Sequence, residues 1–79
     1  MTAMEPLKLV KMANEIAAFF AAEPDPKVAA DGVASHLKRF WDPRMRAQLL
    51  AWVDEHAGAG LVPLALEAVR AKRADLAPR

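Results

Sequence analysis

Prolines divide this chain into segments of helical length. Pro6 and Pro63 each precede a run of helix-forming residues, and the dipeptide Asp-Pro occurs at 25–26 and again at 42–43. Proline suits the first turn of a helix, because its missing N–H would have no partner there, and aspartate is a preferred N-cap. These positions therefore predict four helix starts, two of them with an aspartate cap.

Apolar residues follow each start at spacings of three and four, which is the pattern of a helix with one buried face. The residues expected to face inward are Leu9, Met12, Ala13, Ile16, Phe19, Phe20, Ala29, Ala30, Val33, Leu37, Phe40, Trp41, Met45, Leu49, Leu50, Trp52, Val53, Leu64, Leu66, Ala68 and Val69, with Leu7, Val10, Ala17 and Ala21 widening the first stripe. The first helix is apolar over most of its circumference, so it needs cover on more than one side.

The expected fold is an all-α small bundle of three main helices plus a shorter fourth helix. Residues 1–79 form a single domain, with helices at about 5–22, 26–40, 43–57 and 62–73. Because it is charged and ends near a proline, the stretch 74–79 is expected to be a frayed tail.

The totals exclude several classes of protein. The chain has 79 residues and no cysteine, so disulfides, zinc–thiolate sites and cysteine nucleophiles are absent. Eleven basic and ten acidic residues leave a net charge of +1, which argues against a general affinity for nucleic acid. Neither a signal peptide nor an apolar run of the ~20 residues needed to span a bilayer is visible. A bacterial, cytoplasmic protein is expected.

The segment from Lys38 to Arg46 concentrates positive charge beside an aromatic residue. Arg39, Arg44, Lys38 and Arg46 surround Trp41, against a single acid. Stacking on nucleic-acid bases would use such residues, but Trp41 continues an apolar stripe, which favours a core or interface position. The arginines are either solvated or pair with acids of another chain, since arginine and tryptophan are typical of binding hot spots.

Three polar residues are candidates for chemistry. His36 lies near Asp42 in sequence, but neither it nor His56 has a partner at metal-ligand or catalytic spacing. The position of Asp42 before a proline makes a helix N-cap the simpler reading. We therefore expect structural or interfacial roles for both histidines, and no catalytic residue.

Asn14 lies on an otherwise apolar flank of the first helix. A buried amide needs hydrogen bonds, so Asn14 either bonds inside the bundle or reaches a partner's backbone. The chain's three glycines match neither a Walker loop nor a dinucleotide fingerprint.

Three stretches of the chain together resemble a known family. "LVKMANEIAAFFAAEPDP", "GVASHLKRFWDPRMRAQLLAWV" and "GAGLVPLALEAVR" are similar to the delta subunit of NAD-dependent, molybdenum-containing formate dehydrogenases, over about Leu9 to Arg70. The positions that match the family motif are Asn14, His36, Arg39, Trp41, Asp42, Pro43, Arg44, Met45 and Arg46.

The resemblance implies a non-catalytic accessory subunit that associates with the molybdenum-containing catalytic (alpha) subunit and supports assembly or stability. It implies that other subunits carry the bis-molybdopterin guanine dinucleotide, the iron–sulfur clusters, FMN and NAD, and that this chain holds no cofactor. The residues expected to bind the partner are His36, Lys38, Arg39, Trp41, Arg44, Arg46 and Asn14.

Three alternatives remain open at this point. The chain could be a helical nucleic-acid-binding or regulatory interaction module, or a small enzyme that uses His36 with Asp42. When isolated, it could also cover apolar surface by forming a homo-oligomer.

Overall fold

A computed structural model describes residues 5–78 of the chain, and within this range every regular element is helical. The helices are α1 (Pro6–Phe20), α2 (Pro26–Phe40), α3 (Pro43–His56), α4 (Pro63–Ala71) and α5 (Arg73–Leu76). The prediction of an all-α bundle is confirmed. Residues 1–4 of the predicted domain and residue 79 of the predicted tail lie outside the described residues.

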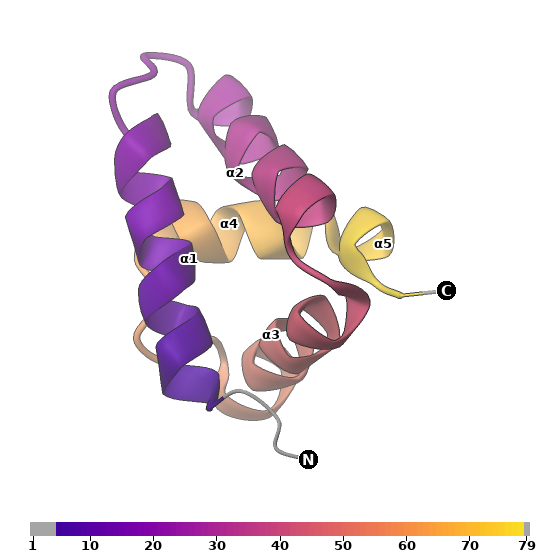
Figure 1. Cartoon of the computed structure of the whole chain (residues 1–79). Helices are drawn as coiled ribbons and strands as arrows, with labels where there is room; N and C mark the ends of the chain where they lie inside the picture. Colours follow the sequence, from indigo (N-terminus) through magenta and orange to yellow (C-terminus); the bar gives the residue numbers. More distant parts are fainter. Residues whose placement is uncertain (1–4, 79) are drawn as a thin grey trace.

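The helices pack around one another without forming a parallel stack. α1 and α2 lie side by side, joined by a short loop at one end, and α4 crosses behind both of them (Figure 1). α3 packs against α1 near the end of α1 that lies away from the loop to α2, and α5 packs against α2 and α3. None of the described helices is long and apolar enough to cross a membrane.

Proline occupies the first turn of each of the four longer helices. The two aspartate caps are also confirmed. Asp25 accepts a hydrogen bond of 2.9 Å from the N–H of Lys27. Asp42 accepts two, from the N–H groups of Arg44 at 2.9 Å and Met45 at 3.0 Å. Oδ1 of Asp42 thus completes the first turn of α3.

We expect Asp42→Ala to lower the free energy of unfolding by about 1 kcal/mol, since the cap of α3 is lost. Urea unfolding followed by circular dichroism measures the change. Glu15→Ala, at an exposed position in the middle of α1, is the matched control and should change stability by less than about 0.5 kcal/mol. Equal effects of the two substitutions would show that the Asp42 cap does not add to the free energy of unfolding.

The core is built from aliphatic side chains of all five helices together with Trp41. Its largest fully buried side chains are Leu9, Leu37, Leu49, Leu76, Val33 and Val69. Six buried alanines lie between them on α1, α2 and α4, namely Ala13, Ala17, Ala30, Ala34, Ala65 and Ala68. Side chains this small let helices approach closely, and the distance between packed helices depends on the side chains at their contact.

Three large residues predicted to face the core are exposed instead, and so is Ala21 at the end of α1. Phe19 is 79% exposed, Phe40 is 68% exposed and Leu7 is 63% exposed. The other helices cover only part of the apolar circumference of α1, so Phe19 and Leu7 stay outside. At the end of α2 the backbone turns extended at Trp41, which carries the indole inward and leaves Phe40 on the surface.

The stretch expected to fray begins within a short helix. The backbone breaks at Lys72, and α5 follows with Leu76 only 1% exposed. The Nζ of Lys38 donates to the carbonyl oxygen of Asp75 at 2.7 Å, and Arg73 pairs with Asp54 on α3. One buried leucine and these two contacts hold α5 against the bundle.

Candidate functional site

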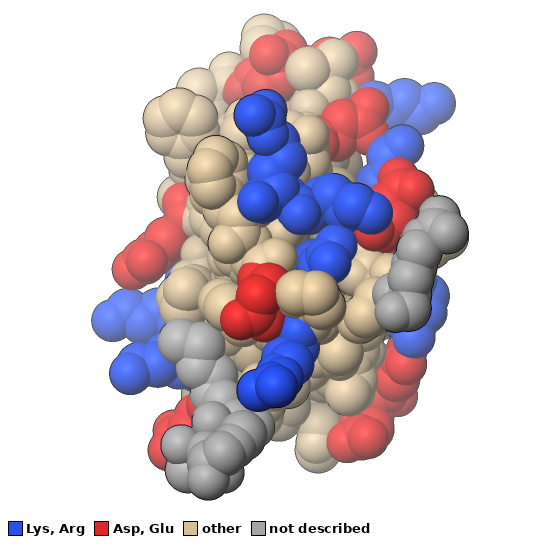
Figure 2. All heavy atoms as spheres, turned by 45° about the vertical axis from the view of Figure 1, so that its right-hand side comes forward, with Lys and Arg blue, Asp and Glu red and all other residues tan. Residues whose placement is uncertain are grey.

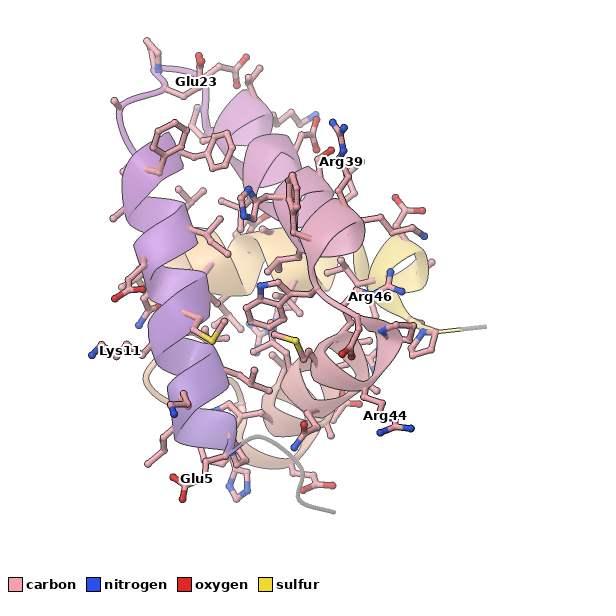
Figure 3. The ribbon with its side chains drawn as sticks, viewed as in Figure 1. Glu5, Lys11, Glu23, Arg39, Arg44 and Arg46 are labelled. Carbon is pink, nitrogen blue, oxygen red and sulfur yellow. The ribbon has the colours of Figure 1, made fainter. Side chains whose placement is uncertain are left out.

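The basic residues singled out in the sequence gather where α2 ends and α3 begins. Figure 3 shows Arg39, Arg44 and Arg46 on the same side of the molecule, along the right-hand edge of the view. When that side is turned forward, Lys and Arg side chains form a column down the face, interrupted by one acidic group (Figure 2). We call Lys38, Arg39, Arg44 and Arg46 the basic edge.

Two rings connect the basic edge to an aromatic surface. The guanidinium carbon of Arg39 lies 5.8 Å from the centre of the Phe40 ring, within the range of a cation–π contact. The Phe40 ring in turn lies 4.7 Å from that of His36, tilted by 43°. Residues four apart share a helix face, so His36 and Phe40 form one continuous ledge on α2.

An apolar groove lies beside this ledge, between α1 and α2. It has a volume of about 440 Å³ and is lined by Met12, Glu15, Ile16, Phe19, Phe20, His36 and Trp41. The Phe19 and Phe20 rings meet edge to face, with centres 5.1 Å apart. Phe20 also lies over Gly32, where a Cβ atom would come within 2.5 Å of its ring. Phe20 is therefore fixed against α2, and the exposed Phe19 ring is fixed against Phe20.

Sequence reasoning placed Phe19 and Phe40 in the core and so missed them as surface residues. Both lie on predicted apolar stripes, and helical spacing alone gives no sign of which stripe residues a neighbouring helix covers. The relevant signal was that α1 carries more apolar circumference than a small bundle can cover.

Arg46 has an unusual environment for a charged side chain. Its Nε and Nη1 atoms are buried, yet neither has a hydrogen-bond acceptor within the described part of the chain. In contrast, Arg73 pairs with Asp54 on the neighbouring helix. A buried donor without an acceptor costs roughly 1–3 kcal/mol, and more when it is charged. The fold itself does not explain why an arginine occupies position 46.

Lys38, Trp41 and Asn14 are committed to contacts inside the chain. The ammonium of Lys38 holds α5, and Trp41 is buried with its indole against the groove. The amide of Asn14 donates from Nδ2 to the carbonyl of Gly60 at 2.9 Å and accepts at Oδ1 from the N–H of Val62 at 2.9 Å. Of the two roles left open for Asn14, the structure contains the intrachain one.

We expect Asn14→Ala to cost about 1–3 kcal/mol of stability, because both backbone groups that Asn14 bonds lose their partner. Thermal or urea unfolding measures the loss. Lys11→Ala, exposed on the same helix, serves as control. If Asn14→Ala unfolds like the control, the two hydrogen bonds do not stabilise the α3–α4 connection.

The second tryptophan and histidine complete the same connection. The Nε1 of Trp52 donates to the carbonyl of Ala59 at 2.8 Å, and its ring lies 4.2 Å from the ring of His56. Ala57 ends α3 in the left-handed conformation, with φ of 55°. Within residues 5–78, His, Asp and Glu side chains do not gather into a group that could hold a metal ion.

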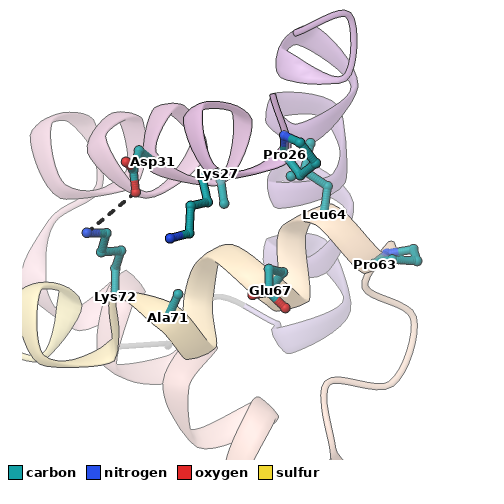
Figure 4. A pocket seen from close by; sticks show the side chains of 9 residues that line it. Pro26, Lys27, Asp31, Pro63, Leu64, Glu67, Ala71 and Lys72 are labelled. Carbon is teal, nitrogen blue, oxygen red and sulfur yellow. Dashed lines mark ion pairs between the residues drawn. The ribbon is translucent and has the colours of Figure 1, made fainter. Parts of the chain in front are cut away.

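A larger hollow lies between α2 and α4, with a volume of about 620 Å³. Charges of both signs line it, and Asp31 and Lys72 form an ion pair of 3.4 Å across it (Figure 4). Lys27 and Glu67 add one more charge of each sign. The hollow therefore offers no excess charge and no converging set of like groups to recognise a ligand.

Comparison with known families gives one match. The model of the family described as NADH-dependent formate dehydrogenase delta subunit FdsD matches residues 8–69. The matched range contains the groove residues and the whole basic edge. Searches of curated proteins and of solved structures found no match.

Proposed function

Since the chain belongs to the FdsD family of NADH-dependent formate dehydrogenase delta subunits, we propose that it is a non-catalytic accessory subunit. In this proposal it binds the molybdenum-containing catalytic subunit and supports the assembly or stability of the complex. The observation that carries the proposal is the family match over residues 8–69.

The distribution of side chains supports a binding role over a catalytic one. Asp42 caps a helix through Oδ1, and the amide of Asn14, which does not titrate, bonds the backbone of a turn. His36 stacks on Phe40, which makes its ring part of an aromatic ledge. Exposed arginines beside exposed aromatic rings are instead typical of protein-binding hot spots.

The residues proposed to bind the partner divide into two groups. His36, Arg39, Arg44 and Arg46 would contact the catalytic subunit directly. Lys38, Trp41 and Asn14 would act indirectly, by holding α5, the groove wall and the α3–α4 connection in place.

Co-purification tests this proposal. A tagged form of the chain is expressed together with the other subunits of the complex, and the captured material is analysed for the molybdenum-containing subunit. We expect both to elute together in a constant ratio through size-exclusion chromatography. Recovery of the tagged chain alone, with the molybdenum subunit assembled elsewhere, would contradict the proposal.

The resembled complex also bears on cofactors. In our proposal the bis-molybdopterin guanine dinucleotide, iron–sulfur clusters, FMN and NAD sites all belong to other subunits. Metal analysis and the visible absorption of the separately purified chain check this point. Stoichiometric molybdenum, iron or flavin in the chain alone would be the opposing result.

A further inference from the structure

We propose that the apolar groove and the basic edge form one docking surface, whose occupant is a segment of the partner subunit carrying an apolar anchor beside acidic side chains. This inference rests on the proposed function and adds to it the position of the interface and the chemistry of the segment that it receives.

The apolar half of the surface is unusually exposed for a domain of this size. Phe19 and Phe40 are the two most exposed large hydrophobic residues within residues 5–78. Phe19 lines the groove from α1, and Phe40 adjoins it through His36, which both lines the groove and stacks on Phe40. Exposed apolar surface that is contiguous and bordered by polar groups is typical of interaction sites. An apolar side chain entering this groove would be enclosed by rings on both sides.

The basic half of the surface carries one acid against four basic groups. Asp42 is the acid within the segment from Lys38 to Arg46, and its Oδ1 accepts the two hydrogen bonds that cap α3. Arg44 lies in the first turn of that helix, where the helix dipole disfavours a positive charge. Arg46 buries two donor atoms without an acceptor. A carboxylate of the partner segment would offset the unfavourable charge at Arg44 and accept hydrogen bonds from Arg46. Arginine binds carboxylates through directed, charge-assisted hydrogen bonds.

The two halves are adjacent, which is why one segment can use both. Phe40 contacts Arg39 on one side and His36 on the other, so the ledge joins the basic edge to the groove wall without a gap. In Figure 2 the column of basic side chains runs directly beside a tan, uncharged surface. This arrangement of the surface therefore predicts that the partner segment carries an apolar anchor residue with acidic residues next to it.

A protein segment fits this surface better than two other occupants do. A nucleic acid would be drawn to a broad basic face, whereas the net charge of the chain is only +1 and the anchor site is an apolar groove. A second copy of the chain related by a two-fold axis presents the same patch, so its basic edge would add positive charge at the interface.

The test uses the chain co-expressed with the other subunits and captured through a tag on the molybdenum subunit. One variant combines Phe19→Ala with Phe40→Ala, and another combines Arg39→Glu with Arg46→Glu. We expect each to reduce the retained chain by about tenfold or more, as for the loss of hot-spot residues. The matched controls are Val28→Ala and Arg70→Glu, which alter exposed residues outside the surface and should stay within about twofold of wild type.

The outcomes separate this inference from the proposed function. If the wild-type chain is not retained, the proposed function itself fails. If the wild type is retained and both double variants are retained equally well, the docking surface is wrong and the proposed function stands. Equal loss in the control variants would also overturn it. Circular dichroism of each free variant establishes that it is folded before its retention is compared.

Two measurements on the isolated chain address the other occupants. Binding of a fluorescent single-stranded DNA probe at low salt, abolished by the arginine variant, would overturn the inference in favour of nucleic acid. A dimer in light scattering that is lost in the phenylalanine variant would overturn it in favour of a second copy. We expect the isolated wild-type chain to be a monomer that does not bind the probe. We expect both double variants to lose binding to the molybdenum subunit.

Discussion

Leu37→Ala is expected to lower the free energy of unfolding by about 2–5 kcal/mol, the range for removing a leucine from a closed core. Leu37 is fully buried at 0% exposure, near the end of α2 and within the core cluster that all five helices share. A chain of 79 residues buries a smaller share of its surface than a larger domain does, so its total stability is low. The loss of one core leucine should therefore unfold a large fraction of the molecules at 37 °C.

The chain supplies its own control for this substitution. Leu7→Ala makes the same chemical change on α1 at a side chain that is 63% exposed. We expect it to alter stability by less than about 1 kcal/mol, because little apolar surface leaves water at that position. Urea unfolding of both variants measures the difference. Equal destabilisation would mean that α2 does not occupy the centre of the core.

Truncation after Lys72 is expected to cost about 2–4 kcal/mol, combining the burial of one leucine with one or two hydrogen bonds. This truncation removes Leu76, the contact of Lys38 with Asp75 and the pair of Arg73 with Asp54. A chain ending at Ala77 keeps all three contacts and is the control. If the two truncated chains unfold at the same urea concentration, α5 adds nothing to the bundle and the tail behaves as frayed.

The starts of the helices were predictable because their signals are local. An aspartate followed by proline specifies its own cap and first turn within four residues, and both Asp25 and Asp42 bond the predicted N–H groups. The all-α architecture followed from apolar spacing in the same way. No knowledge of which helix packs on which was needed for either result.

The surface was not predictable because it depends on contacts between distant segments. Phe19 and Phe20 are adjacent on α1, but Phe20 packs over Gly32 of α2 and is partly buried, whereas Phe19 stays exposed. The bonds of Asn14 run to Gly60 and Val62, 46 and 48 residues further along the chain. Spacing within one helix carries no information about either contact.

Phe40 and Trp41 show a different limit. Apolar spacing admits both residues to the buried stripe of α2, since both follow Leu37 by about one turn. The choice is made by the backbone, which is helical at Phe40 and extended at Trp41. The result is a buried indole and an exposed phenyl ring.

The motif "HLKRFWDPRMR" mixes structural and surface roles. Trp41, Asp42 and Met45 serve the fold, as a core residue, a cap and a side chain packed against the core. Phe40 and Arg46 do not, since one is exposed and the other holds unpaired buried donors. We infer that the second group serves the partner.

The central claim is that this chain is an accessory subunit that stabilises a formate dehydrogenase complex. The direct measurement is to purify the complex from cells that express all other subunits with or without this chain, and to compare molybdenum content and the rate of thermal inactivation. We predict that the complex made without the chain contains less molybdenum per catalytic subunit or loses activity faster, and that supplying the wild-type chain restores it. Identical molybdenum content and identical inactivation rates in the two preparations would contradict the account.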